Sequence, residues 1–414
     1  MSRLIWTPSG HSVLDGALDA VPVTLVGHPF APIGMGEQLR SHLSAARAVK
    51  LDAQVYDVFR SARRDDPAYR TLMDGAECAE LPGGIRIFHI NGDEIEAVLA
   101  AIEARGSVFA AGYNIIVPAW ELPAYPPAWA ALLGRFDEVW ALSTFIEASL
   151  AAAGVASHLI GQSVEAPPGA LLPRRFFGIS ESAFVLLTMF DLSSYARRKN
   201  PDAVLALFER ICREQPLIDA QLVLKVKDGE AGAADWAARL ADNPRIRVIA
   251  QPLDGQAVRS LLSACDVFVS LHRAEGFGRG LGEAMLLGRL AMATGWSGNL
   301  DFMTDANSLL VRSRLVAVRR GQYPHGRGQR WAEPDPDHAY ALLAPILADP
   351  DRGRSIAAKG RADVFLSHGN RAVGLRILDR LEHLAAGAAL HDLLRPARAD
   401  RRRRGDKPAT VKEG

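Results

Sequence analysis

Short apolar runs alternate with helical patterns along most of the chain, and this alternation limits the possible folds more than any other feature. The runs are rich in β-branched and aromatic residues, which is typical of buried strands. Strands that alternate with helices predict a parallel sheet with helices on both faces. Six such runs occupy the first part of the chain, at residues 21–27, 53–59, 85–90, 113–119, 137–143 and 156–161.

The same pattern then occurs a second time. Between the two sets lies EAPPGALLPRR (165–175), whose prolines and glycine favour a connection over a helix or strand. The sequence therefore predicts an α/β protein of two doubly wound, Rossmann-like domains that face each other across a cleft at the carboxyl ends of both sheets. The second set of runs lies at residues 184–191, 221–228, 245–251, 266–272, 289–295 and 308–311.

Four segments follow from this division of the chain. Residues 1–170 form the expected N-terminal domain and residues 177–366 the expected C-terminal domain. Periodicity over 340–386 predicts three helices. Within residues 367–394 the C-terminal helices could pack back on the N-terminal domain, and residues 395–414 are expected to be a basic disordered tail.

Composition fits a two-domain protein that stays in the cytoplasm. The 414 residues are 49% hydrophobic and 23% charged, which is enough for two large cores. No window approaches the ~18 uninterrupted apolar residues that a membrane helix needs, and MSRLIWTPSG lacks the apolar core of a signal peptide. The cysteines Cys78, Cys212 and Cys265 are few and far apart, which favours reduced thiols over a disulfide or zinc framework.

Basic charge is concentrated at the C-terminal end. From Arg395 onward there are eight Lys or Arg and three Asp or Glu. Such a segment is either a solvated end or a weak peripheral contact with the anionic inner face of a membrane. Aromatic residues are not interleaved with this charge, so nucleic acid is not an expected partner.

The stretch AEGFGRGLGEAML (274–286) carries the strongest functional signal. Glu275 follows the carboxyl end of a predicted strand, and a helix is expected to begin at LGEAMLLG, with Glu283 in its first turn. Glycines let backbone N–H groups approach a ligand, and a helix N-terminus favours phosphate. Two carboxylates would repel that phosphate unless they bind neutral hydroxyl groups beside it, as in a nucleotide sugar. The alternative is structural, with Glu283 complementing the helix dipole and Glu275 as a loop acid.

EGFGRGLGEAM, followed by TGWSGNLDFMTDANSLLV, resembles the sugar-donor motif of the family 4 retaining glycosyltransferases of GT-B fold. Other segments resemble the bacterial mannosyltransferase-like branch that builds surface polysaccharides: GMGE (34–37), WELPAYPPAW (120–129), DEVWALSTF (137–145) and FDLSSYARRKNPDAVLALF (190–208). The resemblance covers residues 20–385. It implies transfer of a hexose, such as mannose, with retention, from a nucleotide diphosphate sugar to a saccharide or lipid-linked acceptor.

The resemblance also implies roles for individual residues. Glu283 would bind the ribose hydroxyls and Glu275 the hydroxyls of the donor sugar. Lys199 falls where the family keeps a phosphate-binding lysine, with Arg198 and Lys225 as further candidates. The alternative for the RRK cluster is a solvated helix start. The phosphates would face backbone N–H groups in the segment that contains Phe277, Gly278, Gly280 and Leu281.

The first strand is followed by His28, Gly34 and Gly36, which could face the acceptor or the donor phosphate, while a packed loop histidine is the alternative for His28. Many family members have an arginine where this chain has Ser193 and Ser194, so the donor clamp could differ.

Relatives often carry a histidine after the fourth strand of the N-terminal domain, where this chain reads PAWELP. Glu121 is therefore the candidate for an acceptor contact or proton acceptor, against a structural role.

Other chemistries have less support. The glycines lack the spacing of a dinucleotide-binding GxGxxG, and there is no P-loop. The aspartate pairs Asp65–Asp66 and Asp335 with Asp337 lie in polar segments without a preceding strand, so no metal cofactor is expected. Both glutamates of the donor stretch share one loop, which disfavours a hydrolase. A sugar-nucleotide epimerase of GT-B fold and a non-catalytic subunit of a polysaccharide assembly complex remain alternatives.

Overall fold

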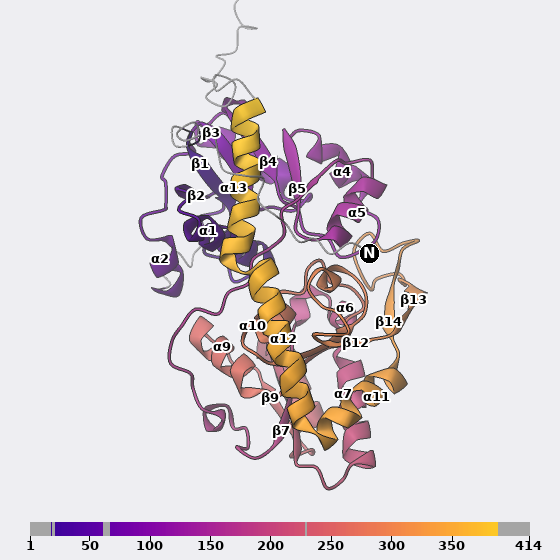
Figure 1. Ribbon diagram of the computed structural model, residues 1–414. Helices are drawn as coiled ribbons and strands as arrows, with labels where there is room; N and C mark the ends of the chain where they lie inside the picture. The colour runs from indigo at the N-terminus through magenta and orange to yellow at the C-terminus, as the bar shows by residue number, and fades with distance from the viewer. Residues whose placement is uncertain (1–17, 19–20, 61–66, 228–229, 388–414) are drawn as a thin grey trace, which may run out of the picture.

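A computed structural model describes residues 18, 21–60, 67–227 and 230–387. Figure 1 shows two α/β domains, one above the other, with the last two helices running along both. None of the described helices is long and apolar enough to cross a membrane. The predicted basic tail, residues 395–414, lies outside the described residues, so its lipid contact stays a prediction.

The N-terminal domain is built on a six-stranded parallel sheet with the order β2-β1-β3-β4-β5-β6. Its strands are β1 (Val23–Gly27), β2 (Ala53–Asp57), β3 (Gly84–Phe88), β4 (Gly112–Ile116), β5 (Glu138–Ala141) and β6 (His158–Leu159). Its helices are α1 (Gly34–Ala48), α2 (Pro67–Met73), α3 (Ile95–Ala104), α4 (Pro127–Leu133) and α5 (Thr144–Ala152), with a 3₁₀ turn at Phe109–Ala111.

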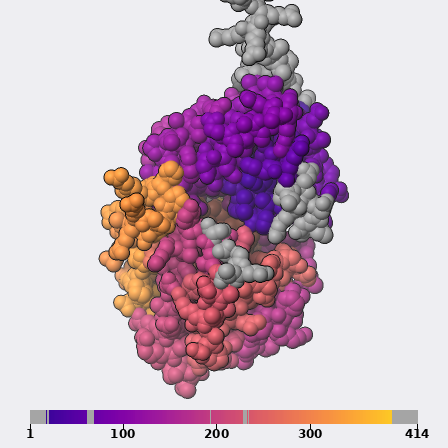
Figure 2. All heavy atoms as spheres, turned by 180° about the vertical axis from the view of Figure 1, so that it is seen from behind, coloured from indigo at the N-terminus to yellow at the C-terminus, as the bar shows by residue number. Residues whose placement is uncertain are grey.

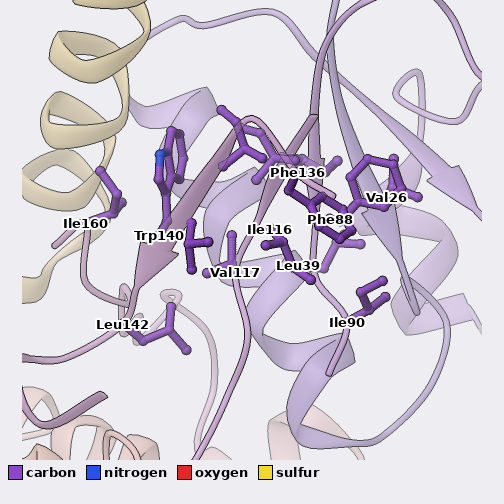
Figure 3. Close-up of a cluster of buried hydrophobic side chains, with 14 of the residues drawn as sticks. Val26, Leu39, Phe88, Ile90, Ile116, Val117, Phe136, Trp140, Leu142 and Ile160 are labelled. Atoms are coloured by element: carbon purple, nitrogen blue, oxygen red, sulfur yellow. The ribbon is translucent and has the colours of Figure 1, made fainter. Parts of the chain in front are cut away.

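The central strands of this sheet are apolar because helices cover both of their faces. Every residue of β1 and β3 is buried, as expected for inner strands of a parallel sheet. Figure 3 shows Phe88, Ile116 and Trp140 from three different strands among the side chains of this core, with Leu39 contributed by α1. The apolar runs of the sequence thus correspond to the strands of this sheet. The carboxyl ends of these strands point toward the other domain.

A second six-stranded parallel sheet, with the order β12-β11-β10-β7-β8-β9, forms the C-terminal domain. Its strands are β7 (Phe184–Asp191), β8 (Ala220–Lys227), β9 (Ile246–Ile249), β10 (Val267–Ser270), β11 (Leu290–Thr294) and β12 (Leu309–Val311). Its helices are α6 (Ala196–Lys199), α7 (Pro201–Glu214), α8 (Glu230–Leu240), α9 (Gly255–Ala264), α10 (Arg279–Leu286) and α11 (Pro336–Ala348), with 3₁₀ turns at Arg174–Phe177, Leu192–Ser194 and Gly298–Asp301.

All twelve predicted strands are present and parallel, so the predicted fold class is confirmed. One pair of strands was not predicted: β13 (Ser313–Ala317) and β14 (Arg330–Pro334) form an antiparallel hairpin between β12 and α11. We call residues 313–334 the hairpin. Its side chains Val318 and Trp331 belong to the core cluster of the N-terminal domain. The hairpin therefore leaves one domain and packs on the other.

The last helices return the chain to its first domain. After α12 (Pro350–His368), α13 (Asn370–Gly387) lies along α1. The approach is close, because a Cβ on Gly374 would lie 2.2 Å from the carbonyl oxygen of Ala45. Arg380 of α13 also forms an ion pair with Glu138 at the start of β5. These contacts hold the last helix on the N-terminal domain.

Candidate functional site

The carboxyl ends of both sheets meet at the junction of the domains, where the surface is hollowed (Figure 2). The loop after β10 lies directly against the N-terminal domain. Ser143 donates its hydroxyl to the carbonyl oxygen of Gly276 at 2.5 Å, and a Cβ on Gly276 would lie 2.9 Å from the carbonyl oxygen of Trp120. A glycine is needed here because backbone from the other domain occupies the space of a side chain.

Glu275 lies at the centre of a buried group of charges. Its side chain pairs with Lys199 Nζ through Oε1 and lies 3.2 Å from an Arg198 nitrogen through Oε2. Burial alone would raise the pKa of Glu275, but Lys199 and Arg198 outweigh it and lower the pKa to about 2. The structure thus brings together three of the predicted site residues and keeps the carboxylate ionised.

Arg198 links acids from both domains. It lies in the short helix α6, which has left-handed residues at both ends, Tyr195 (φ 59°) and Asn200 (φ 55°). Besides Glu275, its guanidinium lies 3.7 Å from a Glu121 oxygen and donates to the Ser194 hydroxyl at 2.9 Å. Its Nε is buried without a partner in the described residues. Ser194, one of the two serines at the position where the resembled family often has an arginine, therefore helps to hold Arg198 in place.

Glu121 of the N-terminal domain contacts the hairpin of the C-terminal domain. Its second carboxylate oxygen accepts a hydrogen bond from the hydroxyl of Tyr323. Burial and the neighbouring charge of Glu121 raise the pKa of Tyr323, so the phenol remains a donor. Sequence reasoning missed Tyr323, because no local pattern places residue 323 beside residue 121.

The position predicted for Glu283 in the first turn of a helix is wrong. Gly278 (φ 92°) caps α10, which begins at Arg279, so Glu283 lies one turn later. There its carboxylate accepts a hydrogen bond from Arg279 Nε at 2.6 Å, four residues earlier. Burial raises the pKa of Glu283, and Arg279 partly offsets this effect. Arg279 also pairs at 2.5 Å with Glu37 of the GMGE segment, across the domain junction.

The start of α10 offers backbone donors. In the described part of the chain, the N–H groups of Gly278, Arg279 and Gly280 have no backbone partner, and the helix dipole favours an anion beside them. Leu281 differs from the prediction, because its N–H donates to the carbonyl oxygen of Gly278 at 3.0 Å. The Phe277 ring is buried against Phe302 and His368, so only its backbone could face a ligand.

Lys225 and the glycines after β1 have local roles in this structure. Lys225 Nζ donates to the carbonyl oxygen of Val226 at 3.0 Å, and burial lowers its pKa. Gly36 is required by packing, since a Cβ there would lie 2.3 Å from the Ala31 carbonyl oxygen, whereas a Cβ on Gly34 would meet nothing within 4 Å. His28 stacks on Phe59 and lies 2.7 Å from a Glu94 oxygen.

Ser297 is a second residue that sequence reasoning missed. Its backbone (φ 82°, ψ −154°) occupies a region that is essentially restricted to glycine, and such strain is typical of functional sites. Its hydroxyl accepts a hydrogen bond from the Glu275 N–H at 3.0 Å. The strained turn therefore fixes the backbone from which Glu275 projects.

The described residues contain no group of three or more His, Cys, Asp or Glu side chains placed to hold a metal ion. Asp335 caps α11 by accepting from two backbone N–H groups, and Asp337 pairs with Arg210. The pair at 65–66 lies outside the described residues. The three cysteines are free thiols.

Sequence comparisons match parts of the chain. Residues 184–318, which run from β7 into the hairpin, match the family model described as glycosyl transferases group 1. An uncharacterized glycosyltransferase of Bacillus subtilis, YqgM, is 26% identical over 207 residues. That alignment covers 49% of this chain and 51% of YqgM, so the chain spans about half the length of this curated relative.

Two solved structures align with most of the length of this chain. HepE from Anabaena in complex with UDP and glucose aligns with a TM-score of 0.60 and 14% identity, covering 88% of this chain and all of HepE. Sucrose-phosphate synthase from Thermosynechococcus elongatus gives a TM-score of 0.61 and 15% identity, covering 89% of this chain and all of that protein. The chain therefore has the GT-B glycosyltransferase fold, and the part of the candidate site that the C-terminal domain contributes, from Lys199 to Glu283, lies within the segment that matches glycosyl transferases group 1.

Proposed function

We propose that this protein is a glycosyltransferase that moves a hexose from a nucleotide diphosphate sugar to a saccharide or lipid-linked acceptor, with retention of configuration. The observation that carries the proposal is the buried group of Glu275, Lys199 and Arg198 beside the N-terminus of α10. An ionised carboxylate, two cations and unpaired backbone donors suit a ligand with hydroxyl groups next to a diphosphate.

The proposed donor lies across the C-terminal domain. Its diphosphate would bind to the N–H groups at the start of α10 and to Lys199, its ribose to Glu283, and its sugar hydroxyls to Glu275. Charge-assisted hydrogen bonds of this kind are roughly twice as strong as neutral ones. Lys199 and Arg198 would then stabilise the charge that develops on the departing diphosphate, a role in which fixed cations are effective. No metal is needed for that step.

On the other side of the junction, Glu121 would contact the acceptor. Its carboxylate lies 3.7 Å from Arg198, whose guanidinium also pairs with Glu275. An acceptor hydroxyl bound to Glu121 would therefore lie close to the transferred sugar. The carboxylate could accept the proton that the hydroxyl loses.

A panel of nucleoside diphosphates and nucleotide sugars tests the proposal. The panel includes UDP-glucose, because HepE was solved with UDP-glucose, and GDP-mannose, because segments outside the donor motif resemble the bacterial mannosyltransferase-like branch. A ligand present at 100 times its dissociation constant should stabilise the fold by about 2.7 kcal/mol, which thermal unfolding detects. Assays for sugar release or transfer with the selected donor, with and without EDTA, follow. The proposal fails if no member of the panel binds, or if turnover strictly requires a divalent metal.

A further inference from the structure

The hairpin carries a concentration of positive charge that the donor site does not use. Residues 312–334, which are the hairpin and the residue before it, contain six arginines and one acidic residue, Glu333, in a chain whose net charge is only +1. The arginines are Arg312, Arg314, Arg319, Arg320, Arg327 and Arg330, and all six are exposed. Such a concentration of exposed positive charge on one surface element favours binding of an anionic partner.

Most of these charges are not neutralised by the protein. Arg312 lies 3.6 Å from Asp335, but the other five arginines have no carboxylate partner in the described ranges. Arg330 donates to the carbonyl oxygen of Leu315 at 2.7 Å, which leaves its charge without an acidic partner among the described residues. Five unpaired guanidinium groups on one hairpin leave a local field that attracts anions.

The hairpin is held rigidly beside the acceptor side of the site. At its base, Glu333 forms two hydrogen bonds with Arg273, at 2.7 and 2.9 Å. At its tip, the Gln329 side chain both donates to and accepts from the backbone of Ala124, each at 2.8 Å. Figure 2 shows this part of the chain, in orange, standing out at the edge of the molecule beside the domain junction.

We propose that the tip of the hairpin, with Arg319, Arg320 and Arg327, and the face that carries Arg330 and Leu315 dock on the anionic phospholipid headgroups of a membrane. Arg314 projects from the opposite face, which it shares with buried Trp331. A single phosphate needs donors that converge on one point, whereas these arginines are spread over both strands and the tip. Spread basic groups fit an extended anionic surface. Leu315 (41% exposed) lies among them, and Tyr195 (46% exposed) packs against Tyr323, as apolar and aromatic side chains do at a membrane interface.

Docking in this way would turn the acceptor side of the domain junction toward the membrane. Glu121 contacts the same hairpin through Tyr323, so a lipid-linked acceptor could reach it from the bilayer surface. This last step rests on the proposed function, whereas the docking itself does not.

Vesicle binding tests the docking without any donor or acceptor. Full-length protein is mixed with vesicles of phosphatidylglycerol and phosphatidylcholine, or of phosphatidylcholine alone, and the bound fraction is measured by sedimentation. Each basic residue near an anionic surface is worth about fivefold in affinity, so the triple variant Arg319→Gln, Arg320→Gln, Arg327→Gln should bind the anionic vesicles roughly a hundredfold more weakly. Added salt should weaken wild-type binding.

Two matched variants separate the hairpin from net charge and from folding. A triple change to lysine at residues 319, 320 and 327 keeps the charge and should keep vesicle binding. The triple variant Arg352→Gln, Arg361→Gln, Arg371→Gln removes the same charge from exposed positions on α12 and α13 and should bind nearly as well as wild type. Melting temperatures of all variants should match that of wild type, since the changed side chains are exposed.

Three results would overturn the inference. One is equal loss of binding in the hairpin and α12–α13 variants, which would mean that net charge alone matters. Another is an affinity for anionic vesicles equal to that of wild type in the triple glutamine variant at residues 319, 320 and 327. The third is binding of inorganic pyrophosphate to these arginines without binding to vesicles, which would identify a soluble anion site. Donor binding is measured separately, so a protein that docks but binds no nucleotide sugar would contradict the proposed function and leave the docking intact.

Discussion

The guanidinium of Arg198 connects glutamates from the two domains in the candidate site. It lies between Glu275 of the C-terminal domain and Glu121 of the N-terminal domain. Breaking a buried ion pair by removing one partner is costly, because it leaves an uncompensated charge. The charged groups are therefore expected to depend on one another, and variants at neighbouring positions should not be additive.

Glu283→Gln should weaken nucleoside diphosphate binding without unfolding the protein. The change removes a charged acceptor for the ribose hydroxyls, which should cost roughly 1.5–3 kcal/mol of binding. Glu214→Gln is a matched control, since Glu214 pairs with Arg210 four residues earlier, as Glu283 pairs with Arg279, but does so on α7. Equal nucleotide affinity of the two variants in calorimetry would remove Glu283 from the ribose site.

Glu121→Gln should leave donor affinity intact and slow transfer. If the carboxylate takes the acceptor proton, the rate should fall by ~10²–10⁴-fold, and by much less if it only positions the acceptor. Donor affinity comes from calorimetry and the transfer rate from product formation. A full transfer rate, or a loss of donor binding, would return Glu121 to a structural role as the partner of Tyr323.

Elements differ in how far the sequence predicts them. The twelve parallel strands follow from apolar runs, because inner strands of such sheets are buried on both faces. The hairpin does not follow from any local pattern, since Val318 and Trp331 are buried only by contact with the other domain. The sequence predicted that Glu121 and Glu275 face the same cleft, because both follow the carboxyl ends of strands. It did not predict the contact of Tyr323 with Glu121, because that contact depends on how the hairpin packs on the other domain.

The start of α10 was mispredicted for a related reason. Glycines at 278, 280 and 282 suggested an extended loop, because glycine has low helix propensity. In the structure Gly280 and Gly282 lie within the helix, where a Cβ would meet the Phe268 ring at 3.3 Å and the Val164 side chain at 3.0 Å. Close packing, which is a tertiary property, explains those two glycines.

Gly298→Ala should destabilise the C-terminal domain, because a Cβ there would lie 1.9 Å from the carbonyl oxygen of Gly276. Overpacking of this kind costs about 1–3 kcal/mol. Gly255→Ala, at the start of α9, is the control, since its Cβ would meet nothing within 4 Å. Urea unfolding measures both. Equal free energies of unfolding for the two variants would mean that the loop before α10 moves to accommodate the added Cβ without cost.

At the scale of the whole molecule, contacts on two sides hold the domains together. The α1–α13 packing lies on one side, and the hairpin contacts with Trp120, Glu121 and Ala124 lie on the other. The Glu37–Arg279 pair crosses between them, beside the proposed ribose site. Donor binding at Glu283 and domain closure are therefore expected to be coupled.

Mild acid should destabilise the protein through buried histidines. Burial lowers the pKa of His42 to about 4 and that of His368 to about 3, from an ordinary value of 6.5. The unfolded chain therefore binds these protons first as the pH falls below 6.5, so stability is lost between pH 6.5 and about 4 for His42 and between pH 6.5 and about 3 for His368. The loss should reach about 2 kcal/mol per histidine by about pH 5.

Urea unfolding at several pH values checks this loss. His42→Gln removes one titrating group and should flatten the decline. Parallel declines for wild type and His42→Gln would show that other groups carry the acid sensitivity.

The central claim is that Glu275 binds the transferred sugar while the start of α10, Lys199 and Glu283 bind the nucleotide. The most direct test is calorimetric titration of Glu275→Gln with the nucleotide sugar selected by the panel and with the matching nucleoside diphosphate. The intact nucleotide sugar should bind roughly tenfold to a hundredfold more weakly than to wild type, because a charged acceptor for the sugar hydroxyls is lost. The nucleoside diphosphate should bind no more weakly than to wild type, because its contacts remain and Lys199 loses the carboxylate that pairs with it. Equal changes for both ligands, or no change for either, would contradict the account.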